Sequence, residues 1–201
     1  MLLNLNALDK SLVYRLLTHT VVPRPIAWVL TENEQGNHNV APFSYFNIVC
    51  SDPAILMFSV GHKRDGSKKD TWQNIERNGK CVVHIATGEL MPDVNESART
   101  LPAGDSELNG MSVSLVEDAE FSLPRIQQCP VAFDCEKHDI HLLGNGPQAV
   151  IYVSINTAYL SDHLALSDRV TLSEKMLNPI ARLGEDRFSL LGDINAIPRP
   201  E

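Results

Sequence analysis

The sequence predicts a mainly β protein, an antiparallel sheet or barrel with a few helices packed outside it. Six apolar segments have the length and the β-branched or aromatic content of strands, whereas only three segments favour helices. The spacing between the strands is too irregular for an internal repeat. The chain has 201 residues, of which 43% are hydrophobic and 21% are charged, and this composition indicates one globular domain over residues 1–201.

The predicted strands are mostly continuous apolar runs. The first ends at a polar run around Gly36 that is typical of a hairpin loop, and the second, about seven residues long, is short enough to favour a buried strand over a helix. The six strands are Pro25–Thr31, Ala54–Val60, Lys80–Ala86, Met111–Glu117, Val131–Leu143 and Ala149–Ala158. Gly144-Asn145-Gly146 predicts a hairpin turn between the last two of them.

The three predicted helices are short. Asp70 can cap a helix over Thr71–Asn78, and Gly79 follows where a left-handed residue usually ends a helix. The other two are Leu90–Thr100 and Leu172–Leu183, of which the second contains Pro179.

Charge and sorting signals limit the possible partners. The 17 Lys and Arg against 25 Asp and Glu give a formal charge of −8, which excludes broad electrostatic binding to nucleic acid or to an anionic membrane. No basic residue precedes Lys10 and no apolar run reaches about 18 residues, so we expect neither a secretory signal nor a membrane span. Cys50, Cys81, Cys129 and Cys135 do not form a disulfide framework, and we expect reduced thiols in a soluble, cytoplasmic protein.

The segment Gly61–Thr71 is a candidate anion site. Lys63, Arg64, Lys68 and Lys69 crowd this segment just before the predicted helix, where free N–H groups favour a negative charge. A phosphate would fit here. The alternative is a solvated loop whose lysines keep it soluble, and the Asp70 carboxylate would compete with an anion for the same N–H groups.

The segment Asn39–Asn47 is a candidate surface for a planar heterocycle. Pro42 suits an edge strand or a bend whose backbone faces a ligand. Ser44 and Asn47 would supply hydrogen bonds, and the aromatic residues between Pro42 and Asn47 would supply apolar cover. The alternative is an ordinary twisted strand whose aromatic residues belong to the core.

Other familiar sites are excluded by spacing. His138 and His141 lie three apart in a predicted strand, so they point to opposite faces and cannot share a metal ion. The same spacing separates Cys81 from His84 and removes a local thiol nucleophile. The chain has no P-loop, no G-x-S-x-G motif and no complete dinucleotide-binding glycine pattern. We therefore expect no metal site and no catalytic side chain.

An ordered set of motifs resembles the flavin reductase-like family of FMN-binding split-barrel proteins, which includes flavoredoxins. The motifs are Pro23–Trp28, Asn39–Asn47, Ser51–Pro53 with Phe58-Ser59, and Lys69–Thr71 with Asn74-Ile75. Weaker similarity continues to Asn178–Gly184, so the resemblance covers about residues 15 to 192. A single motif of this kind would be weak, whereas their shared order and gaps are specific.

The resemblance implies a Greek-key split β-barrel that forms a homodimer and holds one FMN per subunit near the subunit interface. Family members use the Asn-x-Ala-Pro-Phe-Ser segment to line the isoalloxazine ring and the Lys-Asp-Thr segment to hold the phosphate. The implied contacts are Ala41, Pro42, Ser44, Phe46 and Asn47 for the ring or ribityl chain, Lys69 and Thr71 for the phosphate, Arg24, Ile26 and Ser59 as further candidates, and Asp70 as helix cap. Trp28 is either a residue of the core or a cover for the flavin, and residues 64–68 either hold a second phosphate or are solvated.

The implied function is NAD(P)H-dependent hydride transfer through bound FMN to a flavin, to oxygen or to a protein partner. NADH or NADPH would bind only transiently, so the lack of a fingerprint motif does not exclude it. One alternative is a flavoredoxin-like electron carrier that does not oxidise nicotinamide and needs a redox protein partner. Another is a binding module whose barrel holds a different ligand or none.

Overall fold

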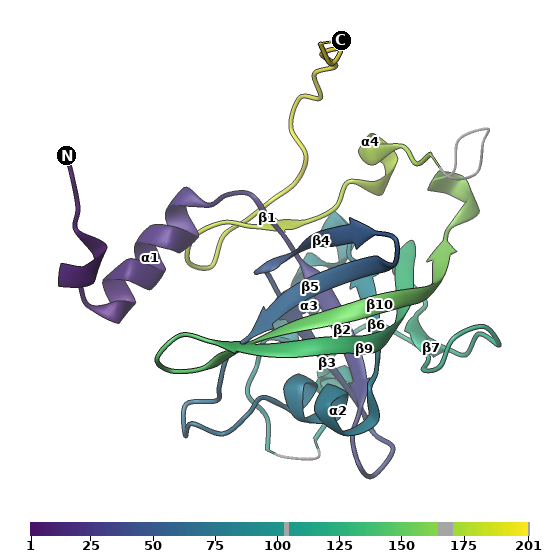
Figure 1. The fold of residues 1–201 in the computed structure, drawn as a ribbon. Coiled ribbons are helices and arrows are strands. Elements are labelled where there is room, and N and C mark those ends of the chain that lie inside the picture. Colours follow the sequence, from purple (N-terminus) through teal and green to yellow (C-terminus); the bar gives the residue numbers. More distant parts are fainter. Residues whose placement is uncertain (103–104, 165–170, 201) are drawn as a thin grey trace.

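The computed structural model describes residues 1–102, 105–164 and 171–200, and its centre is a seven-stranded antiparallel sheet (Figure 1). The strand order is β3-β2-β6-β9-β10-β5-β4. These strands are β2 (Ala27–Glu32), β3 (His38–Phe43), β4 (Phe46–Ser51), β5 (Ala54–Val60), β6 (Lys80–Ile85), β9 (Val131–Leu143) and β10 (Gln148–Leu160).

The sheet curls because its two edge strands are joined by a short bend. β3 and β4 are the opposite edges of the sheet, yet only Ser44 and Tyr45 separate them in the chain. The two edges must therefore meet at this bend, as they do in a barrel. The Ser59 N–H donates to the Tyr45 carbonyl at 2.9 Å and fastens the bend to β5. Pro42 lies in edge strand β3, the kind of strand that tolerates proline in a sheet.

Strand β2 is buried on both faces. Ala27 and Val29 belong to a core cluster inside the curled sheet, which is centred on Phe58 and Ile151. Trp28 and Leu30 belong to a second cluster, which includes Val94, Leu123 and Ile126. Burial on both faces explains why this segment is continuously apolar and does not alternate with polar residues.

Helices and short strands surround the main sheet. The helices are α1 (Lys10–Thr20), α2 (Asp70–Asn78), α3 (Met91–Glu96) and α4 (Glu174–Leu177), with 3₁₀ turns at Leu5–Ala7, Gly88–Leu90, Glu107–Gly110 and Asp162–Leu164. The short strands are β1 (Arg24–Pro25), β7 (Leu115–Val116), β8 (Arg125–Ile126), β11 (Ala181–Arg182) and β12 (Phe188–Ser189). Figure 1 shows α1 to one side of the barrel and the C-terminal segment projecting from it.

Most predicted strands are confirmed, and one is wrong over most of its length. The runs beginning at residues 25, 54, 80, 131 and 149 all form strands of the main sheet, and Gly144 makes the predicted turn with a φ of 84°. Of Met111–Glu117, only Leu115–Val116 is a strand. Met111, Val113 and Leu115 alternate because their side chains pack against the second cluster, while only two residues find a partner strand in β8.

The helix predictions need three corrections. Leu90–Thr100 is helical only over Met91–Glu96, and Leu172–Leu183 only over Glu174–Leu177, since Asn178 turns left-handed before Pro179. Asp70 is not the N-cap of α2 but its first residue; the cap is Lys69, and its side chain makes no capping hydrogen bond. The predicted end of α2 is confirmed, because Gly79 has a φ of 75°. Helix α1 is not anticipated by the sequence interpretation.

Candidate anion site at the start of helix α2

A cleft of about 90 Å³ lies where α2 begins, against edge strand β3. Ala41 and Pro42 line it from the strand, while Lys69, Asp70 and Thr71 line it from the helix start. Residues 97–100, which follow α3, also contribute to the lining. The fold thus brings five of the sequence-predicted residues, from two motifs about 30 positions apart, into one cleft.

The start of α2 keeps its backbone donors available. The N–H groups of the first turn of a helix have no partner within the helix. Gln73 is the first residue whose N–H is bonded along the chain, to the Lys69 carbonyl at 3.1 Å. No side chain of the described residues caps this turn. The Asp70, Thr71 and Trp72 amides are therefore positioned for an external acceptor, and an anion is the favoured one.

The charges around the cleft leave one cation without a carboxylate. Lys63 pairs with Asp70 at 2.7 Å, which neutralises the carboxylate nearest the helix start. Lys69 forms no ion pair with any described residue, and its ammonium lies 6.0 Å from the centre of the Phe43 ring. Although Lys69 as a residue is exposed, desolvation of its ammonium lowers its pKa. A bound phosphate would reverse this shift because it favours the charged form of the ammonium.

A hydrogen-bonded network of buried polar side chains lies under the first turn of α2. The Asn39 amide is 3.1 Å from the Thr71 hydroxyl on one side and 3.2 and 3.3 Å from the two Glu107 carboxyl oxygens on the other. Thr71 is 1% exposed and Glu107 5%, and Glu107 also accepts the Val40 N–H at 3.2 Å. Burial raises the pKa of the Glu107 carboxyl. Glu107 was missed by sequence reasoning, since an isolated Glu in a polar stretch carries no local signal.

The remaining candidates from the β3–β4 segment lie beside the cleft and do not line it. Ser44 sits in the bend, Phe46 packs partly against the inner core cluster, and Asn47 is exposed on β4 with its side chain bonded to the Ile48 N–H at 2.8 Å. Ser59 lies on the neighbouring strand and accepts from Gln148 at 2.9 Å. These residues therefore lie in the bend or on the two strands that follow it, outside the cleft lining.

Arg24 and Ile26 have evident structural roles. The buried Arg24 guanidinium donates to the carbonyls of Thr18, Val21 and Leu183 at 2.7 to 2.8 Å and so ties the end of α1 to the C-terminal part of the chain. One further bond, to the Ser44 hydroxyl at 3.4 Å, reaches the bend. Ile26 is 4% exposed and belongs to the second core cluster.

Packing bears on the two alternatives that the sequence left open. Trp28 is fully buried and its indole N–H donates to Ser97 at 2.9 Å, so it is a core residue. Within residues 64–68, Lys68 is paired with Glu76 at 2.5 Å and Arg64 is exposed, which fits a solvated loop. His138 and His141 are exposed, and among the described residues no group of His, Cys, Asp or Glu is placed to hold a metal ion.

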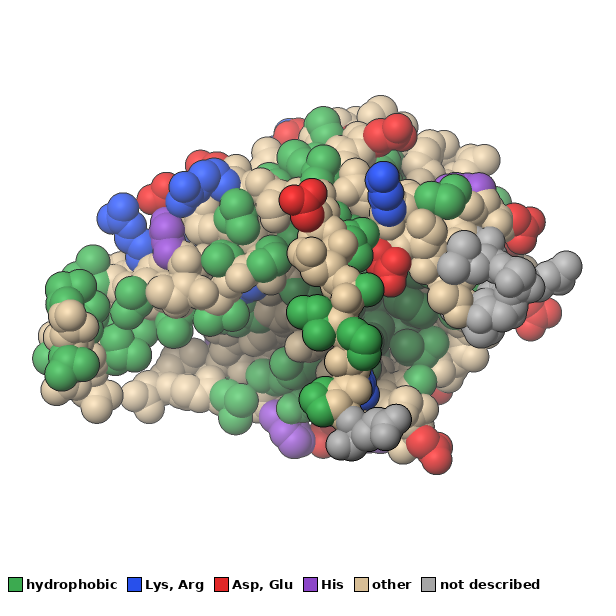
Figure 2. Space-filling model, turned by 90° about the horizontal axis from the view of Figure 1, so that it is seen from above, with side chains coloured by type: hydrophobic (Ala, Val, Ile, Leu, Met, Phe, Trp, Pro, Cys, Tyr) green, Lys and Arg blue, Asp and Glu red, His purple; other side chains and the backbone are tan. Residues whose placement is uncertain are grey.

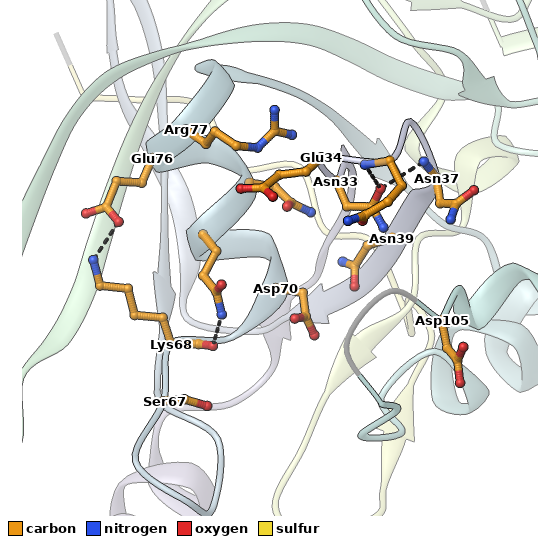
Figure 3. A pocket seen from close by; sticks show the side chains of 13 residues that line it. Asn33, Glu34, Asn37, Asn39, Ser67, Lys68, Asp70, Glu76, Arg77 and Asp105 are labelled. Carbon is orange, nitrogen blue, oxygen red and sulfur yellow. Dashed lines mark hydrogen bonds and ion pairs between the residues drawn. The ribbon is translucent and has the colours of Figure 1, made fainter.

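A larger polar hollow of about 1000 Å³ adjoins the cleft and shares Asn39 and Asp70 with it (Figure 3). Its two cations are already engaged, Lys68 with Glu76 and Arg77 with the Glu32 carbonyl at 2.6 Å. Its other lining side chains are amides, carboxylates and a serine, with no apolar wall for a planar ring. The smaller cleft is therefore the better candidate site.

Comparison with known proteins shows the family of the chain. Residues 18–171 match the family model of the flavin reductase like domain. The chain belongs to the flavin reductase-like family. An uncharacterised member, YwrF of Bacillus subtilis (strain 168), is 34% identical over 192 residues, which cover 93% of each chain.

Solved structures carry the same fold. Nitrilotriacetate monooxygenase component B from Bacillus cereus is 29% identical, with a TM-score of 0.92 over 98% of each chain. A Shewanella frigidimarina NCIMB 400 protein described as a flavin reductase with a split barrel domain is 14% identical, with a TM-score of 0.84 over 97% of this chain and 96% of its own. The predicted mainly β split barrel is thereby confirmed. Membership of this family makes the chain a flavin-related oxidoreductase, and none of its described helices is long and apolar enough to cross a membrane.

Proposed function

We propose that this flavin reductase-like protein binds FMN and uses NADH or NADPH to reduce it, passing the electrons to a flavin, oxygen or a protein partner. The observation that carries the proposal is the Lys69 ammonium, which pairs with no carboxylate of the described residues and lies at the uncapped start of α2, beside the Ala41-Pro42 edge. A phosphate at one end and a planar ring along an edge strand are what FMN presents. The whole chain, 1–201, would act as one FMN-binding domain.

The proposed contacts divide the cofactor between the cleft and the bend. The phosphate would be held by Lys69, by the Thr71 hydroxyl and by the free amides of the first turn. The ion pair with Lys63 would compensate the negative charge of Asp70. Ala41 and Pro42 would line the ribityl chain and the ring edge, and Ser44, Phe46, Asn47 and Ser59 the rest of the ring. Arg24 and Ile26 would support the bend from behind.

The chemistry needs little from the side chains. When bound, FMN would supply the hydride and electron-transfer chemistry, and the protein would supply binding, orientation and exclusion of water. This division fits a cleft whose described lining holds hydroxyl groups but neither Cys nor His to act as a thiol nucleophile or an imidazole base. The role of the chain is then to fix the phosphate end firmly, so that the ring lies at a defined position along β3 and the bend.

A second copy of the chain would complete the site. Pockets for whole cofactors measure about 300–1000 Å³, whereas the cleft measures about 90 Å³, so the ring must extend beyond it. Large apolar side chains of α1, the bend, β4 and the C-terminal segment are exposed; they are Leu12, Tyr14 and Leu17 on α1, Tyr45 in the bend, Ile48 and Val49 on β4, and Leu190 and Leu191. Figure 2 shows hydrophobic side chains gathered where the N-terminal segment and α1 lie. We propose a homodimer closed over this surface.

The free thiols support a proposal about the location. Cys50 is an exposed free thiol, and such a group stays reduced in the cytoplasm. We propose a cytoplasmic enzyme on this basis.

An absorption spectrum of the protein purified without added flavin tests the proposal, followed by anaerobic addition of NADH and then NADPH. Flavin bands that bleach with either nicotinamide are expected. Bands that persist until a reduced protein partner is added would instead indicate a flavoredoxin-like carrier. A colourless protein that gains no flavin bands from added FMN would overturn the proposal and indicate another ligand.

A further inference from the structure

Three buried side chains form a hydrogen-bonded network. It joins the Glu107 carboxyl group, through the Asn39 amide, to the Thr71 hydroxyl, which faces the anion cleft. Its three side chains come from the turn Glu107–Gly110, from β3 and from α2, and all three are at least nine-tenths buried. The Asn39 amide and the Glu107 carboxyl are shielded from bulk water, so their donors and acceptors must be satisfied mainly by one another and by Thr71. The number of hydrogens available then decides how the three groups are oriented.

The spacing admits two orientations of the Asn39 amide. With its nitrogen toward Glu107, the amide donates to the carboxylate and its oxygen accepts the Thr71 hydroxyl hydrogen. With its nitrogen toward Thr71, the amide donates to the hydroxyl, and its oxygen faces Glu107 at 3.2 and 3.3 Å. Two oxygens at that distance need a hydrogen between them, so the second orientation requires a neutral Glu107.

Only the second orientation frees Thr71 for a ligand. When the Asn39 nitrogen donates to the Thr71 oxygen, the hydroxyl hydrogen is available to a phosphate in the cleft. Glu107 is suited to carry the extra proton, because its Oε2 accepts the Val40 N–H at 3.2 Å while Oε1 faces Asn39. In the first orientation the Thr71 hydroxyl donates this hydrogen to the Asn39 oxygen and cannot donate it to a phosphate.

We propose that Glu107 is a positioning residue for the anion site, and that binding of a phosphate at Thr71 is coupled to uptake of one proton by Glu107 through reorientation of Asn39. The inference rests on the proposed binding of FMN phosphate. The proton comes from solvent on binding and returns there on release, and no bond to carbon or phosphorus changes. Glu107 touches no ligand and acts only through Asn39.

The groups around Glu107 shift its pKa in both directions, and burial has the largest effect. Desolvation raises the pKa of Glu107 most, Asp70 on α2 raises it further, and Lys63 on the preceding loop lowers it, as do the Val40 N–H on β3 and the backbone N–H of Glu107 itself. Lys69 and Arg99 line the same cleft from α2 and from the segment after α3. An arriving phosphate adds negative charge next to Glu107 and so favours its neutral form.

Calorimetric titration of FMN into the full-length protein, in two buffers of different ionisation heat, measures the protons taken up. We expect the wild type to take up protons on FMN binding. Glu107→Gln should show only the proton change of the FMN phosphate itself, because the introduced amide donates to Asn39 at every pH. When the pH is raised from 6.5 to 8.5, the FMN affinity of the wild type should fall about tenfold further than the FMN affinity of Glu107→Gln. The uptake of one proton can lower the affinity by at most about tenfold per pH unit. Glu76→Gln, an exposed carboxamide change on α2, should behave as wild type.

Two further measurements separate the possible failures. In a Thr71→Val background, Glu107→Gln should change proton uptake and FMN affinity much less than in the wild-type background, because the hydroxyl that links the two groups is gone and only the direct electrostatic effect of the phosphate is left. Riboflavin, which lacks the phosphate, should bind without dependence on Glu107. Equal proton uptake and equal pH profiles for wild type and Glu107→Gln, with FMN bound by both, would overturn the coupling and leave the function standing. No FMN binding to either protein would instead overturn the proposed function.

Discussion

At the start of α2 the charged side chains that face the cleft are partnered within the chain, except Lys69, whereas along α1 and residues 190–197 large apolar side chains face outward. Lys63 holds Asp70, Glu96 holds Arg99, and Glu107 receives the Val40 N–H. The terminal segments have no comparable cover. One chain therefore builds the anion end of the proposed site by itself, and the exposed apolar surface is where we propose that a second chain binds.

The largest effect is expected when the core that packs against the cleft is disturbed. Phe58 is fully buried and stacks on Phe43, whose ring lines the cleft, at 5.5 Å between ring centres. Phe58→Ala should lower the free energy of unfolding by about 3–5 kcal/mol in a denaturant titration. Leu142→Ala, on the exposed hairpin tip, is the matched control and should change it by less than about 0.5 kcal/mol. Equal losses of unfolding free energy in the two variants would show that Phe58 contributes no more to stability than an exposed leucine, which would contradict the core described above.

Removing the unpaired cation tests the anion end. Lys69→Ala should weaken FMN binding by roughly 10- to 100-fold, since a hydrogen bond to a charged group contributes about 1.5–3 kcal/mol. Quenching of flavin fluorescence measures the affinity. Lys68→Ala removes a neighbouring lysine that is already paired with Glu76, so it should leave FMN affinity within about threefold of wild type. Identical losses from both variants would indicate general charge and no defined site.

Acid should weaken the scaffold through one buried histidine. His84 is fully buried, its Nδ1 lies 3.0 Å from the Trp28 carbonyl and its Nε2 accepts the Ile126 N–H at 2.9 Å, so the ring is held neutral. Desolvation lowers the pKa of His84 to about 4. The unfolded chain binds this proton more readily, so the stability is fully present above pH 6.5 and is lost as the pH falls toward 4.

Between pH 7 and pH 5 this loss should amount to about 2 kcal/mol in the free energy of unfolding. Denaturant titrations at the two pH values measure it. His138→Gln, which removes an exposed histidine, should keep the same pH dependence. A wild-type stability that does not change between pH 7 and pH 5 would contradict a neutral buried ring.

The smallest expected effect concerns the terminal segments. Leu12→Ser with Leu17→Ser removes two exposed apolar side chains from α1, where only Thr18 is buried. The variant should raise the dimer dissociation constant by about tenfold, because each interface side chain near the edge contributes modestly. Sedimentation across a concentration series measures this. A monomeric wild type, or an unchanged dissociation constant, would remove α1 from the interface.

The same contrast explains which parts of the fold could be predicted. Ala54–Val60 and Val131–Leu143 are recognisable because burial within one chain imposes a local apolar pattern. Helix α1 has apolar residues at helical spacing, Leu12, Val13, Leu16 and Leu17 after Asp9. Polar residues interrupt this pattern, and Leu12 and Leu17 are exposed in the structure, so burial within the chain imposes no strong apolar signal here. β4 was missed for a similar reason, since Ile48 and Val49 are exposed on an edge.

The candidate site was only half visible in the sequence. Lys69 and Thr71 could be placed at a helix start because such starts have a local pattern, and the ordered motifs linked them to Ala41 and Pro42. Glu107 could not be found, because its contact with Asn39 spans 68 positions and depends on how the turn after α3 folds back onto β3. Long-range polar contacts of this kind have no periodicity in the chain.

The most direct test of the account compares the affinities of FMN and riboflavin for the wild-type protein under the same conditions. The two ligands share the ring and ribityl chain and differ by the phosphate, which is the group assigned to the start of α2. We predict that FMN binds at least about 30-fold more tightly, consistent with one or two charged hydrogen bonds. Equal affinities for FMN and riboflavin would contradict the assignment of the phosphate to Lys69 and Thr71.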